Sequence, residues 1–301
     1  MSIMQMSRKI YFSNSGDKIA SFVVHIISAL GLLVIIFILW FLFNEGIPVL
    51  KSVTIGEIFG SSDWYPAEEP PALGMFALIT GTLIITLLSS LIALPVSYLF
   101  AIFTAEIAPL WLRNILKPLL ELLGFIPSIV LGFLGMIAVA PWMQEYFGIL
   151  TGLNMLNASL FLGLMILPIV GSLVEEALSS IPKDLRHASS ALGATKWETI
   201  SKVVFPAALP GILSASLLGI MRSMGETMIV LMVAGGAAII PESIFDPLRP
   251  LTSTIASEMG ETPVGSAHYH ALFFAGLILF LITLALNMLS AWIESKWRIT
   301  P

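Results

Sequence analysis

The chain has no cysteine and few charged residues. Among its 301 residues, Asp, Glu, Lys and Arg together make up 11%. The lack of cysteine excludes disulfide bonds, thiolate metal sites and cysteine nucleophiles. Soluble domains carry about 25% charged residues, whereas 57% of this chain is hydrophobic and its mean hydropathy is +0.96. The composition therefore excludes an ordinary water-soluble domain. The N-terminus also lacks a short apolar segment followed by small residues, so we expect no cleaved signal peptide.

Six apolar runs are long enough to cross a bilayer as helices, which takes about 20 residues. They lie at 22–43, 73–103, 122–139, 157–174, 211–235 and 271–293. The second would be roughly 45 Å long as a single helix, so we expect it to tilt, to kink at Pro95 or to project beyond the hydrocarbon core. The sequence predicts an all-α membrane protein with six transmembrane helices. We divide it into an N-terminal part with the first helix and an outer loop (1–72), a five-helix core (73–293) and a C-terminal tail (294–301).

Basic residues lie almost entirely on one side of this topology. Only Lys51 and Arg249 fall in the connections of the opposite side, and Arg222 falls within a span. The other basic residues are Arg8, Lys9, Lys18, Arg113, Lys117, Lys183, Arg186, Lys196, Lys202, Lys296 and Arg298. Under the positive-inside rule, both termini and the loop at 175–210 are expected in the cytoplasm. The loops 45–72, 142–156 and 236–270 are then outside, and residues 251–261 of the last one are expected to form a short helix over the outer mouth.

The loop between the fourth and fifth spans carries helix signals on both sides of a glycine. Pro182 suits the first turn of a helix, and Gly193 can end that helix with a left-handed residue. Thr195 and Glu198 form a Thr-x-x-Glu capping box that starts a second helix. We expect two short helices that project from the membrane. The alternative is an ordinary re-entry loop whose basic residues only set the topology.

This loop resembles the EAA loop of ABC-transporter permeases, E-A-A-x₃-G-x₉-I-x-L-P. Gly193 and Pro206 match with their spacing, and His187 stands at the Glu position. The resemblance implies that the loop docks on a separate cytoplasmic ATPase. The residues expected there are His187, Ala188, Ala191, Gly193, Ala194, Trp197 and Pro206. The chain contains no Gly-x₄-Gly-Lys-Ser/Thr, so we expect ATP and Mg²⁺ on that ATPase and no cofactor in this chain.

Four further stretches resemble the phosphate-specific transport (Pst) permeases. They are KPLLELLGFIPSIVLGFLGM (117–136), MRSMGETMIVLMVAGG (221–236), FDPLRPLTSTIASEMGE (245–261) and SAHYHALFFAGLILF (266–280). The chain is similar to the C-type subunit in the Thr-Met that follows Glu226 and in its extended N-terminal span. The resemblance implies the type I ABC importer permease (MetI-like) fold, phosphate import and a bacterial cytoplasmic membrane. The partners it implies are a second, A-type permease, an ATP-binding subunit dimer and an extracytoplasmic phosphate-binding protein.

Arg222 and Glu226 lie within the fifth apolar run. A charge at the bilayer centre costs roughly 2.5–3.5 kcal/mol on insertion scales, and Arg222 lies roughly 17 Å into the run. A guanidinium matches phosphate oxygens bidentately. A carboxylate can accept a hydrogen bond from protonated phosphate, which ionised sulfate cannot offer. We therefore predict a substrate pathway at Arg222, Gly225, Glu226 and Thr227, with Thr82 and Ser128 beside it.

Other interpretations remain open. Arg222 and Glu226 can form a local ion pair that neutralises itself, although within one helix the favourable order places the acid first. Two apolar residues would also stabilise the helix at least as well as a buried ion pair, so a purely structural role does not require these charges. The competing functions are a permease for sulfate or molybdate, a membrane-embedded enzyme, which needs convergent polar groups at one depth, and a secondary transporter with internal repeats. His268 and His270 do not share a helix face at i,i+2, so we expect no metal site.

Overall fold

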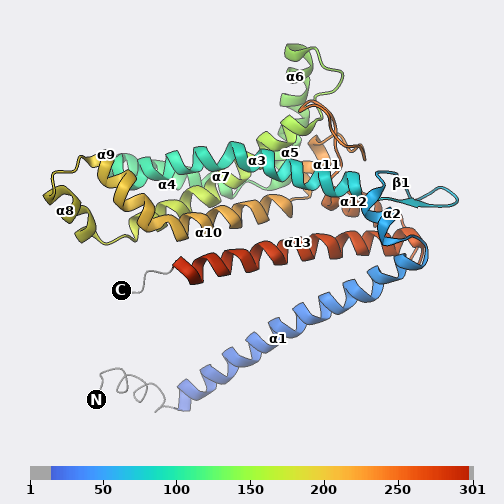
Figure 1. The fold of residues 1–301 in the computed structure, drawn as a ribbon, viewed down its shortest axis with the longest axis horizontal. Coiled ribbons are helices and arrows are strands. Elements are labelled where there is room, and N and C mark those ends of the chain that lie inside the picture. The colour runs from blue at the N-terminus through green and yellow to red at the C-terminus, as the bar shows by residue number, and fades with distance from the viewer. Residues whose placement is uncertain (1–14, 298–301) are drawn as a thin grey trace.

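The structure is a computed structural model that describes residues 15–297. Long helices run side by side, and short elements gather at both ends (Figure 1). The predicted cytoplasmic residues Arg8, Lys9 and Arg298 lie outside the described residues. The α-helices and strands are α1 (Ser15–Gly46), α2 (Ile55–Gly60), β1 (Trp64–Tyr65), β2 (Ala72–Leu73), α3 (Phe76–Ile102), α4 (Leu110–Gly124), α5 (Ser128–Leu134), α6 (Ala140–Phe147), α7 (Met155–Ser179), α8 (Lys183–Ala191), α9 (Lys196–Thr199), α10 (Phe205–Met224), α11 (Met228–Val233), α12 (Leu251–Glu258) and α13 (Ala267–Trp297). A 3-10 helix at Ile47–Lys51 and π-helical turns at Phe103–Ile107, Gly135–Val139 and Ile200–Val204 extend several of them.

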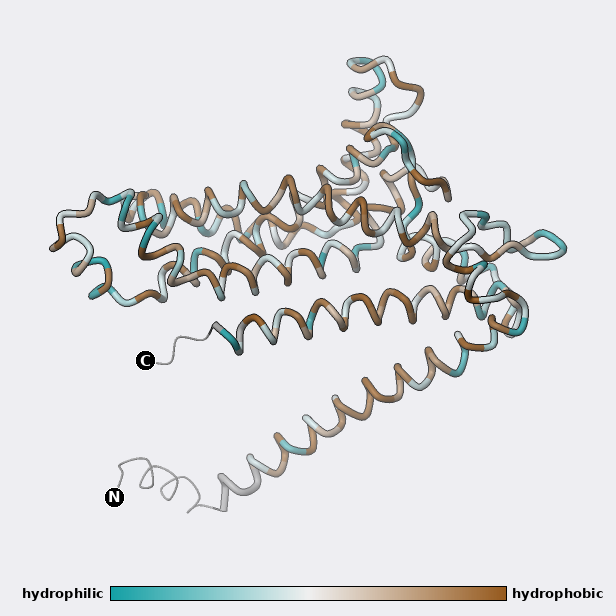
Figure 2. Tube along the Cα trace, in the orientation of Figure 1, coloured by the Kyte–Doolittle hydropathy of each residue, from teal (hydrophilic) through white to brown (hydrophobic). Residues whose placement is uncertain are grey.

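Six helical stretches of the described chain are long and apolar enough to cross a membrane. They are Ala20–Lys51, Phe76–Ile107, Ser128–Phe147, Met155–Ser179, Lys196–Met224 and Ala267–Ile293. Hydrophobic residues dominate the long helices, and hydrophilic residues gather in the connections at their ends (Figure 2). The start of α1 and the end of α13 lie at the end of the molecule that carries α8 and α9 (Figure 1), as an even number of spans requires. The chain is a multi-pass membrane protein.

Two of the predicted spans are not single helices. The third was expected at 122–139, but the helix α4 ends at Gly124 and α5 begins at Ser128. Pro127 is the N-cap of α5 with an extended ψ of 134°, which suits a proline because it has no N–H that a preceding turn would need. The fifth was expected as one helix over 211–235, but it is broken between α10 and α11. By contrast, α3 stays helical through Pro95.

The core of the membrane part lies between α3, α7 and α10. Buried aliphatic side chains fill it, among them Ile166, Val170 and Ile212. At Gly219 of α10 an added Cβ would lie 2.4 Å from Cγ2 of Val170, so only glycine allows α7 and α10 to approach this closely. Ile229 and Val230 of α11 join a second cluster with residues of α3, α5 and α7. Both halves of the fifth span therefore pack against α7, and α11 also packs against α5.

The end opposite to α8 and α9 is built from short elements. The antiparallel pair β1–β2, the helix α2 and the helix α12 lie there, over the ends of α3 and α13 (Figure 1). The predicted short helix at 251–261 is present as α12. At α2, the backbone N–H and the hydroxyl of Thr54 donate to Glu57. These hydrogen bonds hold the pKa of the Glu57 carboxyl below its ordinary value.

Candidate functional site

The fifth span breaks at the residues that the sequence singled out. The helix α10 ends at Met224, and Gly225 is its C-cap. The next helix, α11, begins at Met228, whose N–H donates to Oε1 of Glu226 at 3.1 Å. The carboxylate therefore satisfies one of the backbone donors that a helix start leaves unpaired. The Glu226 carbonyl accepts a hydrogen bond from the hydroxyl of Thr252 at 2.8 Å, which ties the break to α12.

Arg222 and Glu226 form an ion pair across this break. Nη1 of Arg222 lies 2.8 Å from Oε2 of Glu226. Arg222 is in the last turn of α10 and Glu226 precedes the first turn of α11, so each charge lies at the helix end whose dipole favours it. A base four residues before an acid is the less favourable order within one continuous helix. That penalty does not apply to Arg222 and Glu226, because α10 ends between them.

The two members of the pair differ in exposure. The side chain of Glu226 is 4% exposed, whereas that of Arg222 is 45% exposed. In the described part of the chain, the side-chain hydrogen bond of Arg222 runs through Nη1 alone. Nε and Nη2 therefore remain available to a ligand. The pair is thus a buried carboxylate that fixes an accessible guanidinium, and the local ion pair and the ligand-binding interpretation are compatible.

The structure places the other predicted pathway residues at different distances from the break. Gly225 and Thr227 are part of it, exposed and half-buried respectively. Ser128 is the first residue of α5, which packs on α11: an added Cβ at Gly132 would lie 3.3 Å from Cα of Ile229. Thr82 is buried, and its hydroxyl donates to the Leu78 carbonyl and accepts the N–H of Leu251. The bond from Leu251 holds the start of α12 on α3, whereas the bond to Leu78 lies within α3, so the fold already uses the Thr82 hydroxyl.

The predicted two-helix loop forms an exposed projection at the opposite end of the molecule (Figure 1). Gly193 has φ +84° between α8 and α9, and the Thr195–Glu198 capping box is present as expected. Leu192 is 90% exposed and Trp197 is 64% exposed. The remaining residues of the predicted docking surface, His187, Ala188, Ala191, Gly193 and Pro206, are exposed, and Ala194 is half-buried. Apolar side chains this exposed on a soluble loop are typical of a protein interface.

Sequence reasoning missed two ionic clusters at this end of the molecule: one anchors α8 of the loop to Glu106, and the other joins α4 to α7. Arg186 of α8 pairs with Glu106, 2.5 Å away, and donates to the Leu178 carbonyl at 2.9 Å. Glu175, whose side chain is 3% exposed, accepts from Lys117 at 2.7 Å and pairs with Arg113. Arg113 and Lys117 are four residues apart on α4, so they share one helix face. The spacing of Arg113 and Lys117 could have indicated a shared acidic partner. Glu175 was not considered because it lies one residue beyond the predicted fourth span, 157–174.

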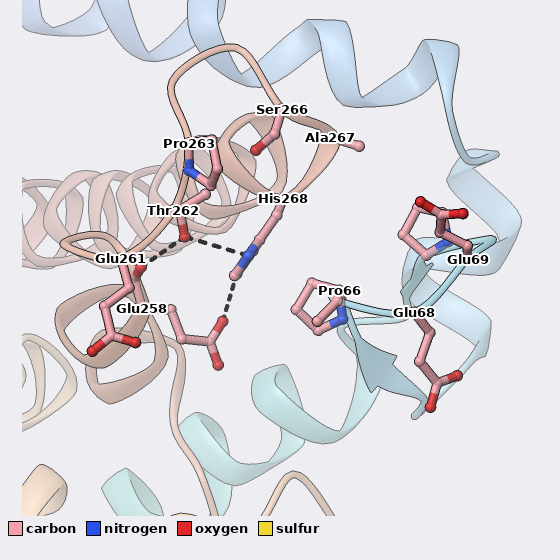
Figure 3. Close-up of a pocket in the computed structure, with 12 residues that line it drawn as sticks. Pro66, Glu68, Glu69, Glu258, Glu261, Thr262, Pro263, Ser266, Ala267 and His268 are labelled. Carbon is pink, nitrogen blue, oxygen red and sulfur yellow. Dashed lines mark hydrogen bonds and ion pairs between the residues drawn. The ribbon is translucent and has the colours of Figure 1, made fainter.

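Figure 3 shows a cavity at the other end, with a volume of about 520 Å³, between the β1–β2 connection and the α12–α13 junction. Glu258 is its central group: it accepts from His268 at 2.7 Å and from Nε1 of Trp64, and pairs with Arg249 at 2.7 Å. His270 instead contacts the Glu45 carbonyl at 2.7 Å. Among residues 15–297 there is no group of three or more His, Asp or Glu side chains placed to hold a metal ion.

Comparisons with known proteins match most of the chain. The family model described as binding-protein-dependent transport system inner membrane component matches residues 97–299. The probable ABC transporter permease protein YqgH of Bacillus subtilis is 38% identical over 251 residues, which cover 83% of this chain and 81% of that protein. The phosphate transport system permease protein PstC of Pasteurella multocida is 36% identical over 241 residues, 74% of each chain.

The fold is shared with a solved structure. A chain from the crystal structure of a bacterial ABC transporter involved in the import of the acidic polysaccharide alginate superposes with a TM-score of 0.59. The alignment covers 92% of this chain and 96% of that one, with 17% sequence identity. At this identity the likeness shows the fold alone.

Proposed function

Because the chain belongs to the family of binding-protein-dependent transport system inner membrane components, we propose that it is the C-type permease subunit of an ATP-driven importer of inorganic phosphate. Its relatives are transport permeases, and the chain is a transport subunit and not an enzyme. The relative from Pasteurella multocida is a phosphate permease by name. The observation that carries the proposal is the accessible guanidinium of Arg222, held at a break in the fifth membrane helix by a buried carboxylate.

The chemistry of the pair suits hydrogen phosphate. Nε and Nη2 of Arg222 offer donors to two oxygens of the anion, the bidentate geometry that guanidinium favours. An ionised carboxylate accepts hydrogen bonds and cannot donate them, so Glu226 accepts the O–H of a protonated phosphate. An anion bound by one arginine is held weakly enough to leave again, which conduction requires. High affinity then belongs to a separate binding protein.

The partners follow from the family. The chain pairs with a second, A-type permease so that each contributes half of the translocation pathway. An ATPase dimer, which carries ATP and Mg²⁺, docks on α8 and α9 through Leu192, Trp197 and their neighbours. The end that carries these helices is the cytoplasmic side of a bacterial inner membrane, as the basic residues there indicate. The extracytoplasmic phosphate-binding protein docks on the end formed by α2, β1–β2 and α12.

The direct test is substrate uptake by the reconstituted complex. Vesicles that contain both permeases, the ATPase dimer and the binding protein are supplied with ATP and labelled phosphate, sulfate or molybdate. We expect ATP-dependent uptake of phosphate alone. Uptake of sulfate or molybdate in place of phosphate would assign the chain to another oxyanion, which is the second candidate function.

Glu226→Gln is expected to weaken the preference for phosphate over sulfate by about tenfold, because one charge-assisted hydrogen bond contributes about 1.5 kcal/mol or more. The amide can still accept from the Met228 N–H, so the helix break should persist. The measurement is inhibition of labelled phosphate uptake by unlabelled sulfate in wild-type and variant vesicles that use the same binding protein. Equal inhibition by sulfate in wild-type and variant vesicles would show that Glu226 does not accept a hydrogen bond from protonated phosphate.

A further inference from the structure

A second cavity lies at the end of the molecule that carries α8, far along the helices from the break in the fifth span. Its volume is about 330 Å³, and its lining comes from four elements. The lining residues are Ala105, Glu106, Arg113, Ser179, Lys183, Arg186 and His187. Three of these are permanent cations and one is a carboxylate, so the cavity is electropositive.

Several donors in this cavity are not used by the fold. The hydrogen bonds of Arg113 run through Nη2 alone, to Glu175 and Ser179, which leaves its Nε and Nη1. Lys183 is exposed and forms no side-chain hydrogen bond within residues 15–297; His187 is exposed as well but belongs to the predicted ATPase docking surface. Arg186, in contrast, is occupied by Glu106 and by two backbone carbonyls. The available donors therefore come from α4 and α8 and face one cavity.

The surroundings of the cavity are apolar on one side. The second and fourth membrane stretches end at Ile107 and Ser179, so the cavity lies where the hydrocarbon core gives way to the head-group region. Between the lining residues Glu106 and Arg113 in the chain, Ile107 is 47% exposed, Leu110 is 76% exposed and Trp111 is 66% exposed. Tryptophan favours the membrane interface, and these three side chains offer an apolar surface to an acyl chain whose head group reaches Arg113.

We propose that this cavity binds the phosphate group of an anionic phospholipid. A basic pocket between membrane helices on the cytoplasmic side has the chemistry that recognises such a head group. Inorganic phosphate offers the same anionic oxygens, but it has no acyl chain to contact the apolar side chains of Leu110 and Trp111. Because Lys183 and His187 belong to α8, the bound lipid also connects the projecting loop to α4. The site shares no residue with the break at Gly225–Thr227, and the proposal does not depend on which anion the complex transports.

The test is lipid binding to the delipidated, detergent-purified complex, measured by native mass spectrometry with phosphatidylglycerol and phosphatidylcholine. Lys183→Gln is expected to weaken phosphatidylglycerol binding about fivefold, since a basic residue at an anionic surface contributes about 1 kcal/mol. Lys183→Arg should bind as the wild type does. Lys196→Gln removes an exposed lysine of α9 outside the cavity and is the matched control.

Inorganic phosphate at millimolar concentration is added as a separate arm. Phosphatidylglycerol binding that exceeds phosphatidylcholine binding and falls only in Lys183→Gln supports the lipid site. If phosphate itself binds in a Lys183-dependent manner while phosphatidylglycerol shows no preference, the cavity is a phosphate-group site and the lipid is the wrong source. If Lys183→Gln changes the binding of neither probe, the proposal is overturned.

Discussion

Arg222→Gln is expected to reduce phosphate uptake by about 100-fold or more in a complex that still assembles. The wild-type guanidinium offers two charge-assisted hydrogen bonds to the anion, each of which contributes about 1.5–3 kcal/mol. Glutamine has no charge and cannot present the same fork of donors. Its amide can still donate to Glu226, so the buried carboxylate keeps a partner and the break between α10 and α11 is preserved.

The measurement is ATP-dependent uptake of labelled phosphate, with assembly checked by co-purification of the ATPase and the second permease. Arg222→Lys is the matched control. It keeps the charge but loses the planar fork, so we expect an intermediate loss of about tenfold. Wild-type uptake by a well-assembled Arg222→Gln complex would show that the ion pair is only structural and would remove the central argument for the pathway.

Leu192→Asp is expected to detach the ATPase from the permease. Leu192 is 90% exposed at the junction of α8 and α9, so the substitution should leave the folded chain intact. Full burial of a leucine at an interface contributes about 1.5–3 kcal/mol, and a buried carboxylate adds a desolvation cost. We therefore expect the affinity for the ATPase to fall by about 10-fold to 100-fold.

Co-purification of the ATPase at a series of concentrations measures this effect. Leu150→Asp is the control, because Leu150 is 98% exposed in the connection between α6 and α7, at the end of α7 that lies away from α8. It should retain the ATPase fully. If Leu192→Asp retains it as well, the ATPase docks elsewhere, and the interpretation of the projecting loop as the docking element fails. The pathway proposal at Arg222 would be unaffected by that result.

The importer permease fold that the sequence implied is confirmed by the family match and by the shared fold of the alginate transporter chain. Gly193 and the Thr195–Glu198 capping box marked the projecting loop correctly, since Gly193 takes the left-handed conformation and Thr195 caps α9, whereas Pro182 is the N-cap of α8 rather than part of its first turn. These features are local: a cap, a turn or an apolar run depends on residues that are neighbours in the chain. For that reason a single sequence is enough to predict them.

The interruption of the fifth span was not predicted, because hydropathy alone does not distinguish one long helix from two short ones. What separates them is the carboxylate of Glu226 on the Met228 N–H and the hydroxyl of Thr252 on the Glu226 carbonyl, which comes from 26 residues further along the chain. Nor did the sequence indicate that the Thr82 hydroxyl accepts the Leu251 N–H from α12.

By itself, the sequence determined that the chain crosses the membrane six times, that a two-helix loop projects from one end and that Arg222 and Glu226 are the ionisable pair of the fifth span. Only the tertiary structure decided that the helix breaks between them, that Glu226 is buried while Arg222 is accessible, that Glu106 anchors the projecting loop through Arg186, and that Glu175 joins α7 to α4. The reason is physical. Insertion into a bilayer depends on the summed hydropathy of consecutive residues, whereas the burial and pairing of a charge depend on side chains that only folding brings together.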